Sequence, residues 1–208
     1  VEESACTKPL RPEFTRTSRR LLESARSVLG WKERGHLDPR DEAVRRSILV
    51  QFPKLGRAPV RKEMMEALDL PEAELDASLR RLQVLDLLYL DTGTNEILVA
   101  YPFSTKLTPH VISFFGSADT KPVFAQCAVD ALGIPFMFGR AVSIASSCPF
   151  CTGPLSIEVG GGAIRNRHPA DIAVWVPTCR SQCRRFDLPH IEFLLFAHPC
   201  RGLATESS

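Results

Sequence analysis

The chain of 208 residues contains no run of eighteen apolar residues, and this absence excludes a membrane-spanning helix. Its first twenty residues also lack the apolar segment of a secretory signal peptide, so we expect a cytoplasmic protein. Neither sign of charge dominates, because 26 Lys and Arg stand against 24 Asp and Glu. The net charge of +2 is too small to indicate a nucleic acid or a membrane surface as partner. The 44% apolar content is sufficient for the core of one or two globular domains.

Cysteine is unevenly distributed along the chain. In an oxidising compartment an odd count would leave one thiol unpaired, and disulfide scaffolds are usually smaller chains. In a reducing cytosol the same clustering indicates thiol chemistry or ligation of a soft metal. Six of the 7 cysteines follow residue 126, and the full set is Cys6, Cys127, Cys148, Cys151, Cys179, Cys183 and Cys200.

The N-terminal half has the periodicity of helices. A tail and one helix are expected in residues 1–37, and Phe52-Pro53 should break the helix that follows. Three helices and a hairpin are typical of a winged-helix arrangement, which we assign to residues 38–103. The expected helices cover residues 39–49, 60–70 and 71–85, and the hairpin covers residues 87–99.

The charge of this region argues against DNA binding. Residues 51–100 carry six basic and nine acidic side chains, a net charge of −3. The helix that would read DNA begins with Glu72, Glu74 and Asp76, which phosphates would repel. A structural or dimerising role is therefore favoured, and we do not expect a nucleic-acid partner.

In residues 104–208 the pattern changes to one of short apolar strands separated by turn residues, with one apolar, helical segment over residues 123–132. This pattern predicts an α+β domain with a mixed or antiparallel sheet behind the helical domain. The expected strands cover residues 111–115, 142–145, 155–159, 172–176 and 191–196.

Cys127 and Asp130 are the first candidates for chemistry. Side chains at positions i and i+3 of a helix share a face, so the thiol and the carboxyl would be neighbours. The surrounding apolar residues would desolvate Asp130, raise its pKa and favour the protonated form that donates a proton. On spacing alone, a buried cysteine beside a capping or solvent-facing aspartate is the simpler interpretation.

A second group of thiols could bind a metal. Cys148 and Cys151 form a CxxC pair, and a structural zinc site would need two further ligands, such as Cys179 and Cys183. Arg180 and its neighbouring arginines would favour the thiolate form of that second pair. A thioredoxin-like redox site is not expected, because no βαβ unit surrounds the CxxC. A single packed cysteine at Cys148 explains the sequence equally well.

The stretch over residues 124–159 resembles the organomercurial (alkylmercury) lyases, and the similarity extends more loosely over residues 40–196. The family has a Cys-Ala-Leu-Asp segment, a downstream Pro and Gly-Arg/Lys, and a Ser-x-Cys…Thr-Gly strand entry. The matching residues here are Cys127-Ala128-Val129-Asp130, Pro135, Gly139-Arg140, Ser147-Cys148 and Thr152-Gly153.

The resemblance implies an enzyme that cleaves carbon–mercury bonds by protonolysis, giving a hydrocarbon and Hg(II). Cys127 then matches the mercury-binding nucleophile, Asp130 the proton donor, and Cys148 a more structural cysteine. Leu188 stands where the family has its second catalytic cysteine. Cys183 is therefore the first candidate for the second mercury ligand and Cys151 the other.

The resemblance implies no organic cofactor, with Hg(II) as bound product and zinc as a possible metal. The expected substrate is an organomercurial, and low-molecular-weight thiols or a mercuric reductase would accept the product. Two alternatives stay open: a non-catalytic protein that binds mercury or zinc through Cys148, Cys151, Cys179 and Cys183, and a metal-responsive regulatory protein.

Overall fold

The computed structural model describes residues 37–116, 118–175 and 195–197. The chain divides into two compact units, Val1–Asp38 and Pro39–Ser208, and the elements below all lie in the second. The helix expected in the N-terminal tail lies outside the described residues. None of the helices in the described part of the chain has the length and apolar character needed to cross a bilayer.

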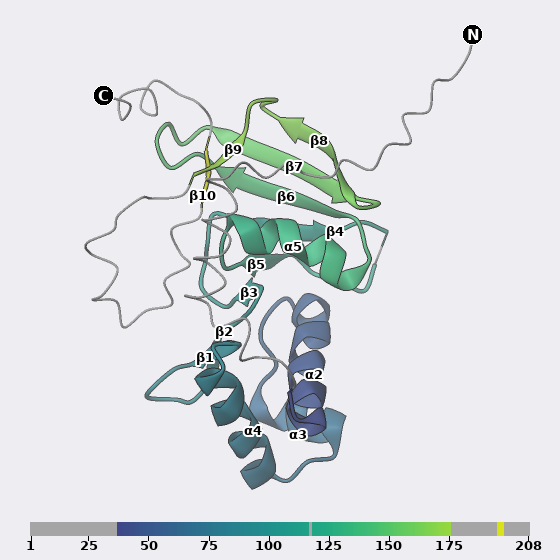
Figure 1. Cartoon of the computed structure of the whole chain (residues 1–208), viewed down its shortest axis with the longest axis vertical. Helices are drawn as coiled ribbons and strands as arrows, with labels where there is room; N and C mark the ends of the chain where they lie inside the picture. Colours follow the sequence, from purple (N-terminus) through teal and green to yellow (C-terminus); the bar gives the residue numbers. More distant parts are fainter. Residues whose placement is uncertain (1–36, 117, 176–194, 198–208) are drawn as a thin grey trace, which may run out of the picture. The chain divides into compact units, whose positions relative to one another are not determined.

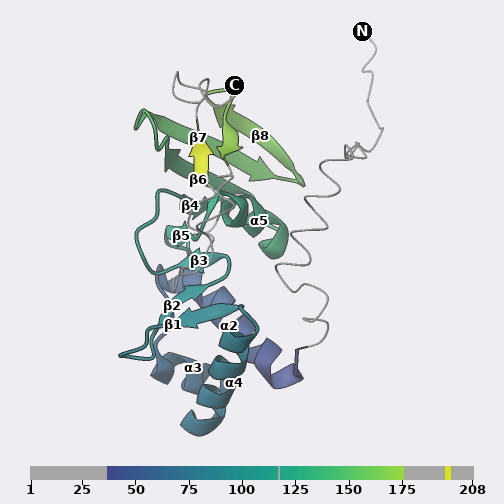
Figure 2. The same ribbon diagram turned by 60° about the vertical axis from the view of Figure 1, so that its left-hand side comes forward.

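Three helices and a hairpin come first, in the predicted order. Figure 2 shows the helices packed together beside the hairpin. Asp41, in the first turn of one helix, is 2% exposed and accepts two hydrogen bonds of 2.7 and 2.8 Å from Arg81 of another. The elements are α2 (Pro39–Leu55), α3 (Arg61–Leu68), α4 (Glu72–Val84), β1 (Leu88–Leu90) and β2 (Ile97–Ala100).

The break expected at Phe52-Pro53 is wrong, because α2 continues through Pro53 to Leu55. Pro53 lies in the last turn, where its missing N–H removes only one helical hydrogen bond. Phe52 is buried and stacks on Phe103 with ring centroids 5.0 Å apart, so packing stabilises this last turn. Gly56 follows the helix directly, and its φ of +73° suits a residue without a Cβ.

The unit contains an eight-stranded antiparallel sheet, with the strands in the order β1-β2-β3-β5-β4-β6-β7-β8. The predicted α+β class is therefore confirmed, with an antiparallel sheet. A second antiparallel pair joins β9 (Ala173–Trp175) and β10 (Leu195–Ala197). The strands not yet introduced are β3 (Phe103–Ser104), β4 (Val111–Phe114), β5 (Val123–Ala125), β6 (Val142–Ser147), β7 (Pro154–Gly160) and β8 (Ala163–His168).

The helix expected over residues 123–132 is partly wrong, since residues 123–125 form β5 and the helix α5 covers Ala128–Phe138. Figure 1 shows α5 lying against the sheet. Its last residue, Phe138, contacts Phe103 and Phe114 with ring centroids 5.7 and 5.4 Å apart. Packing of the C-terminal end of α5 on the sheet thus fixes the helix in place.

Strand β8 was not expected from the sequence. All six of its residues are exposed, so buried apolar residues do not alternate with exposed polar ones along the strand. His168 is the last residue of this strand. Hydrogen bonding to β7, rather than burial, defines β8.

Candidate functional site

The candidate site lies where β5 passes into α5. Cys127 is the N-cap residue of the helix, with an extended backbone at φ −149°. Its Sγ accepts a hydrogen bond of 3.4 Å from the backbone N–H of Asp130. An N-cap side chain reaches the backbone amide three residues later in this way. The structure therefore places the thiol and the carboxyl-bearing residue together, as the spacing predicts, although Cys127 precedes the helix instead of lying within it.

Burial governs the electrostatics of this pair. Cys127 is 1% exposed, and Oδ2 of Asp130 is buried without a hydrogen-bond partner among the described residues. Burial raises the pKa of Asp130 to about 6, although hydrogen bonds with Cys127 oppose the rise. Burial, followed by the nearby charge of Asp130, raises the pKa of the Cys127 thiol well above its usual range. Near pH 7 the pair therefore holds one proton, and that proton is on sulfur.

Tyr101 lies near Cys127. Phe103 pairs with Ala125 and Ser104 with Phe124, and Tyr101 stands just before this pairing on one segment as Cys127 stands just after it on the other. The backbone N–H of Gln126 donates to the carbonyl of Pro102 at 2.9 Å and extends that ladder. The Tyr101 hydroxyl is buried and has no hydrogen-bond partner among the described residues. Sequence reasoning missed Tyr101, because only strand pairing brings it to the site.

The other predicted cysteines within the described residues belong to a different turn of the chain. Cys148 and Cys151 lie in the turn between β6 and β7, the first buried and the second exposed. The turn is closed by the backbone N–H of Thr152, which donates to the carbonyl of Cys148 at 2.9 Å. Cys179 and Cys183 lie outside the described residues. Within the described ranges, no three His, Cys, Asp or Glu side chains gather to hold a metal ion.

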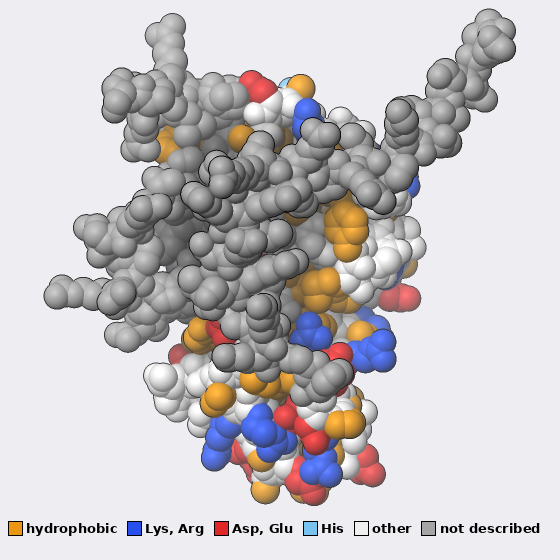
Figure 3. All heavy atoms as spheres, viewed as in Figure 1, with side chains coloured by type: hydrophobic (Ala, Val, Ile, Leu, Met, Phe, Trp, Pro, Cys, Tyr) orange, Lys and Arg blue, Asp and Glu red, His pale blue; other side chains and the backbone are white. Residues whose placement is uncertain are grey.

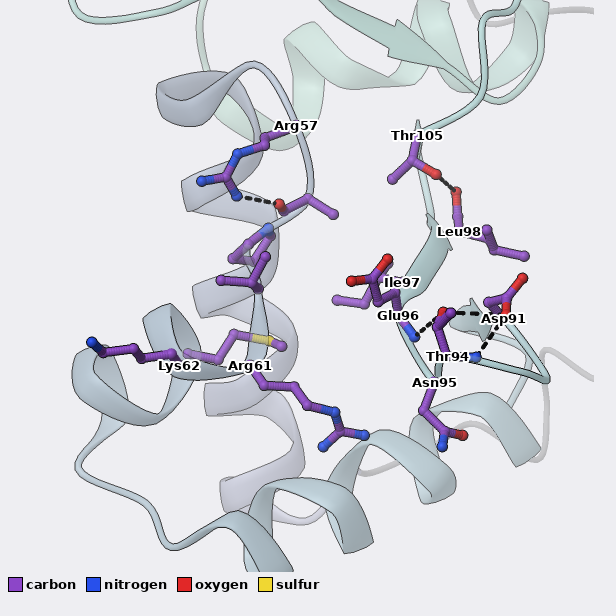
Figure 4. Close-up of a pocket in the computed structure, with 14 residues that line it drawn as sticks. Arg57, Arg61, Lys62, Asp91, Thr94, Asn95, Glu96, Ile97, Leu98 and Thr105 are labelled. Atoms are coloured by element: carbon purple, nitrogen blue, oxygen red, sulfur yellow. Dashed lines mark hydrogen bonds between the residues drawn. The ribbon is translucent and has the colours of Figure 1, made fainter.

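A cavity of about 620 Å³ lies elsewhere, between α3 and the β1–β2 hairpin (Figure 4). No cysteine is among its lining residues. Figure 3 shows acidic and basic side chains interspersed over this helical part of the molecule. The basic side chains of the cavity wall already have acidic partners, which makes this a poor site for an anion. The pairs are Arg57 with Glu63 at 2.6 Å, Lys62 with Glu66 at 3.8 Å, and Arg61 with Asp76.

Comparison with known proteins points to the Cys127 site. The family model described as alkylmercury lyase (MerB) matches residues 103–187. A solved structure, the mercury-bound form of MerB2, shares the fold with a TM-score of 0.56 at 19% sequence identity. The similarity covers 74% of this chain and 70% of that one. The segment of this chain that is similar to the alkylmercury lyase family, residues 103–187, includes both Cys127 and Asp130.

Proposed function

We propose that this protein is an organomercurial lyase that cleaves carbon–mercury bonds by protonolysis, releasing a hydrocarbon and Hg(II). The family match supports this class of reaction. The single observation that carries the residue assignment is the buried contact between Cys127 and Asp130 at the start of α5. It supplies a soft ligand for mercury and a titratable oxygen beside it.

The first step is capture of the organomercurial by Cys127. Mercury is a soft metal, for which thiolate is a strongly preferred ligand. The thiol is protonated in the free protein, so a base must take its proton as the sulfur–mercury bond forms. The Asp130 carboxylate is in contact with the thiol and is mostly ionised at neutral pH. In this step the sulfur–mercury bond forms, the original inorganic or thiolate ligand leaves, and the proton moves from sulfur to Asp130.

The second step is cleavage of the carbon–mercury bond. A second sulfur on mercury increases electron density on the carbon and makes it basic enough to protonate. Asp130 then acts as general acid and transfers its proton to that carbon, as the carbon–mercury bond breaks. The hydrocarbon leaves, Asp130 is again a carboxylate, and Hg(II) stays on the thiolates until low-molecular-weight thiols or a reductase remove it.

Cys183 is our first candidate for the second sulfur. The segment that matches the alkylmercury lyase family extends to residue 187 and so includes Cys183. Neighbouring arginines would favour its thiolate form. Cys151 is the other candidate, because its exposed position in the β6–β7 turn leaves its thiol accessible.

We further propose that residues 38–103 are a winged-helix-like domain with a structural role, followed by the lyase domain in residues 104–208. The succession of α2, α3, α4 and the β1–β2 hairpin supports this assignment. The interspersed acidic and basic side chains on the visible face support a role other than DNA binding (Figure 3). We place the protein in the cytoplasm, since a reducing compartment would keep its thiols available.

The test is to incubate the full chain with phenylmercuric acetate and excess dithiothreitol and to measure benzene by gas chromatography. We expect repeated turnover by the wild-type protein and no capture by Cys127→Ser. Asp130→Asn, which lacks the carboxylate that accepts the thiol proton, should capture the reagent more slowly and release no benzene. Parallel Cys183→Ser and Cys151→Ser variants identify the second sulfur, which is the one whose loss abolishes benzene release. Stoichiometric mercury binding by the wild-type protein without benzene above the buffer level would contradict the proposed enzyme.

A further inference from the structure

The Tyr101 hydroxyl and the Asp130 carboxyl are a second pair of polar groups at the site. The backbone N–H of Gln126 donates to the carbonyl of Pro102 at 2.9 Å. Tyr101 precedes Pro102, and Cys127, the N-cap of the helix that carries Asp130, follows Gln126. Tyr101 is therefore a close neighbour of the reacting pair, although it lies far from that pair in sequence.

Two buried polar atoms here have no hydrogen-bond partner among the described residues, Oη of Tyr101 and Oδ2 of Asp130. Buried phenol hydroxyls and carboxyl oxygens are normally hydrogen-bonded, because leaving one unsatisfied costs free energy. The two atoms are chemically complementary, since a phenol donates and a carboxyl oxygen accepts. Catalytic hydrogen bonds are often long in the free enzyme and shorten in the substrate complex.

Electrostatics keeps the Tyr101 hydroxyl in its donor form. Burial first, followed by Asp86, Tyr89, Asp130 and Cys127, raises the pKa of Tyr101 far above its usual value. Asp130 and Cys127 therefore lie close enough to act electrostatically on this hydroxyl. The phenol is protonated at neutral pH and has a proton to donate.

The neighbouring Tyr89 provides an internal contrast. Its ring packs edge-on against that of Tyr101 with centroids 6.3 Å apart. Its hydroxyl donates a hydrogen bond of 2.7 Å to Asp86, outside the reacting pair. Tyr89 therefore shares the packing of Tyr101, whereas its hydroxyl is directed to a different carboxylate.

We propose that Tyr101 is a positioning residue for the proton donor, its hydroxyl donating a hydrogen bond to Oδ2 of Asp130 in the substrate complex. This role rests on the proposed lyase function. The hydrogen bond fixes the rotation of the carboxyl, so that its other oxygen carries the proton between Cys127 and the carbon. It also stabilises the carboxylate that remains after the proton has been transferred.

The experiment compares kcat and KM for phenylmercuric acetate in the wild-type protein, Tyr101→Phe and the matched control Tyr89→Phe. Loss of the Tyr101 hydroxyl should reduce kcat about tenfold to a hundredfold, the range expected for one hydrogen bond to a reacting group. KM and the stoichiometry of mercury capture should stay within about twofold of wild type. Tyr89→Phe should keep the wild-type kcat.

The possible outcomes distinguish the role of Tyr101 from the proposed lyase function. Active wild-type protein together with a fully active Tyr101→Phe variant would overturn the role of Tyr101 alone. An equal loss in Tyr89→Phe, or a loss in Tyr101→Phe that appears mainly in KM, would show a general packing effect and overturn it as well. A wild-type protein that releases no benzene would overturn the lyase function and, with it, this role.

Discussion

The backbone N–H of Asp130 donates a 3.4 Å hydrogen bond to Sγ of Cys127, so one sulfur both caps α5 and is presented beside a carboxyl. Because the cap contact is made by the backbone of Asp130, its side chain is not needed to hold the sulfur in place. Helix initiation therefore brings the two reacting groups together before any substrate binds. Proton transfer between the thiol and the carboxyl should therefore depend on pH.

The pH dependence of capture should follow the ionisation of Asp130. Its pKa is raised from 3.8 to about 6, so acidification removes the carboxylate near pH 6 instead of near pH 4. Capture needs this carboxylate to accept the thiol proton, and kcat/KM should therefore rise about tenfold per pH unit below 6 and level off above it. Initial rates of benzene release between pH 5 and pH 9 would check this. In Asp130→Asn the rate of stoichiometric mercury capture should lose this dependence, whereas a wild-type rate that falls above pH 6 would contradict the assigned order of proton transfers.

The same pKa shift predicts that Asp130 destabilises the folded protein at neutral pH. A carboxyl whose folded pKa lies above its unfolded value loses stability as pH rises from about 4 through 6. Asp130→Asn should therefore increase the free energy of unfolding at pH 7 by about 1–3 kcal/mol and have little effect at pH 4. Urea denaturation at the two pH values measures the difference. Equal effects at the two pH values would mean that packing, rather than ionisation, determines the stability change at this position.

Replacement of the two buried cysteines by serine should separate their roles. Serine is a preferred N-cap, so Cys127→Ser should keep the fold and lose stoichiometric mercury capture. Cys148 is 1% exposed, and a serine there buries a hydroxyl at a cost of about 1–3 kcal/mol. Cys148→Ser should therefore lower the melting temperature and retain capture. Isothermal titration with HgCl2 and thermal melts would check both variants, and a loss of capture in Cys148→Ser alone would reverse the assignment.

The thiols should also differ in their rates of alkylation. Cys151 is exposed, whereas Cys127 is buried with a raised pKa and so presents little thiolate. We expect iodoacetamide to modify Cys151 well before Cys127 in the folded protein at pH 7.5. Peptide mass spectrometry over a time course measures the order, and urea-unfolded protein is the control in which the two rates should become similar. Rapid labelling of Cys127 in the folded state would show that its thiol is accessible and ionised.

Features that depend on neighbours in sequence were predicted well. The order of α2, α3, α4 and the β1–β2 hairpin followed from apolar periodicity and turn residues. The contact between Cys127 and Asp130 followed from their spacing. The Pro53 break was wrong, because burial of Phe52 against Phe103 outweighs one lost helical hydrogen bond. Strand β8 was missed, because a strand exposed along its whole length has no alternation to detect.

The sequence by itself determined the chemistry available to this protein: a cysteine and an aspartate one helical turn apart, within a motif that resembles the alkylmercury lyases. Only the tertiary structure decided the protonation states, since desolvation depends on the side chains that pack around the pair. It also decided that Tyr101 lies near Cys127, because the hydrogen bond between Gln126 and Pro102 joins segments distant in sequence. Local spacing fixes which groups are neighbours along the chain, whereas packing fixes where their protons reside.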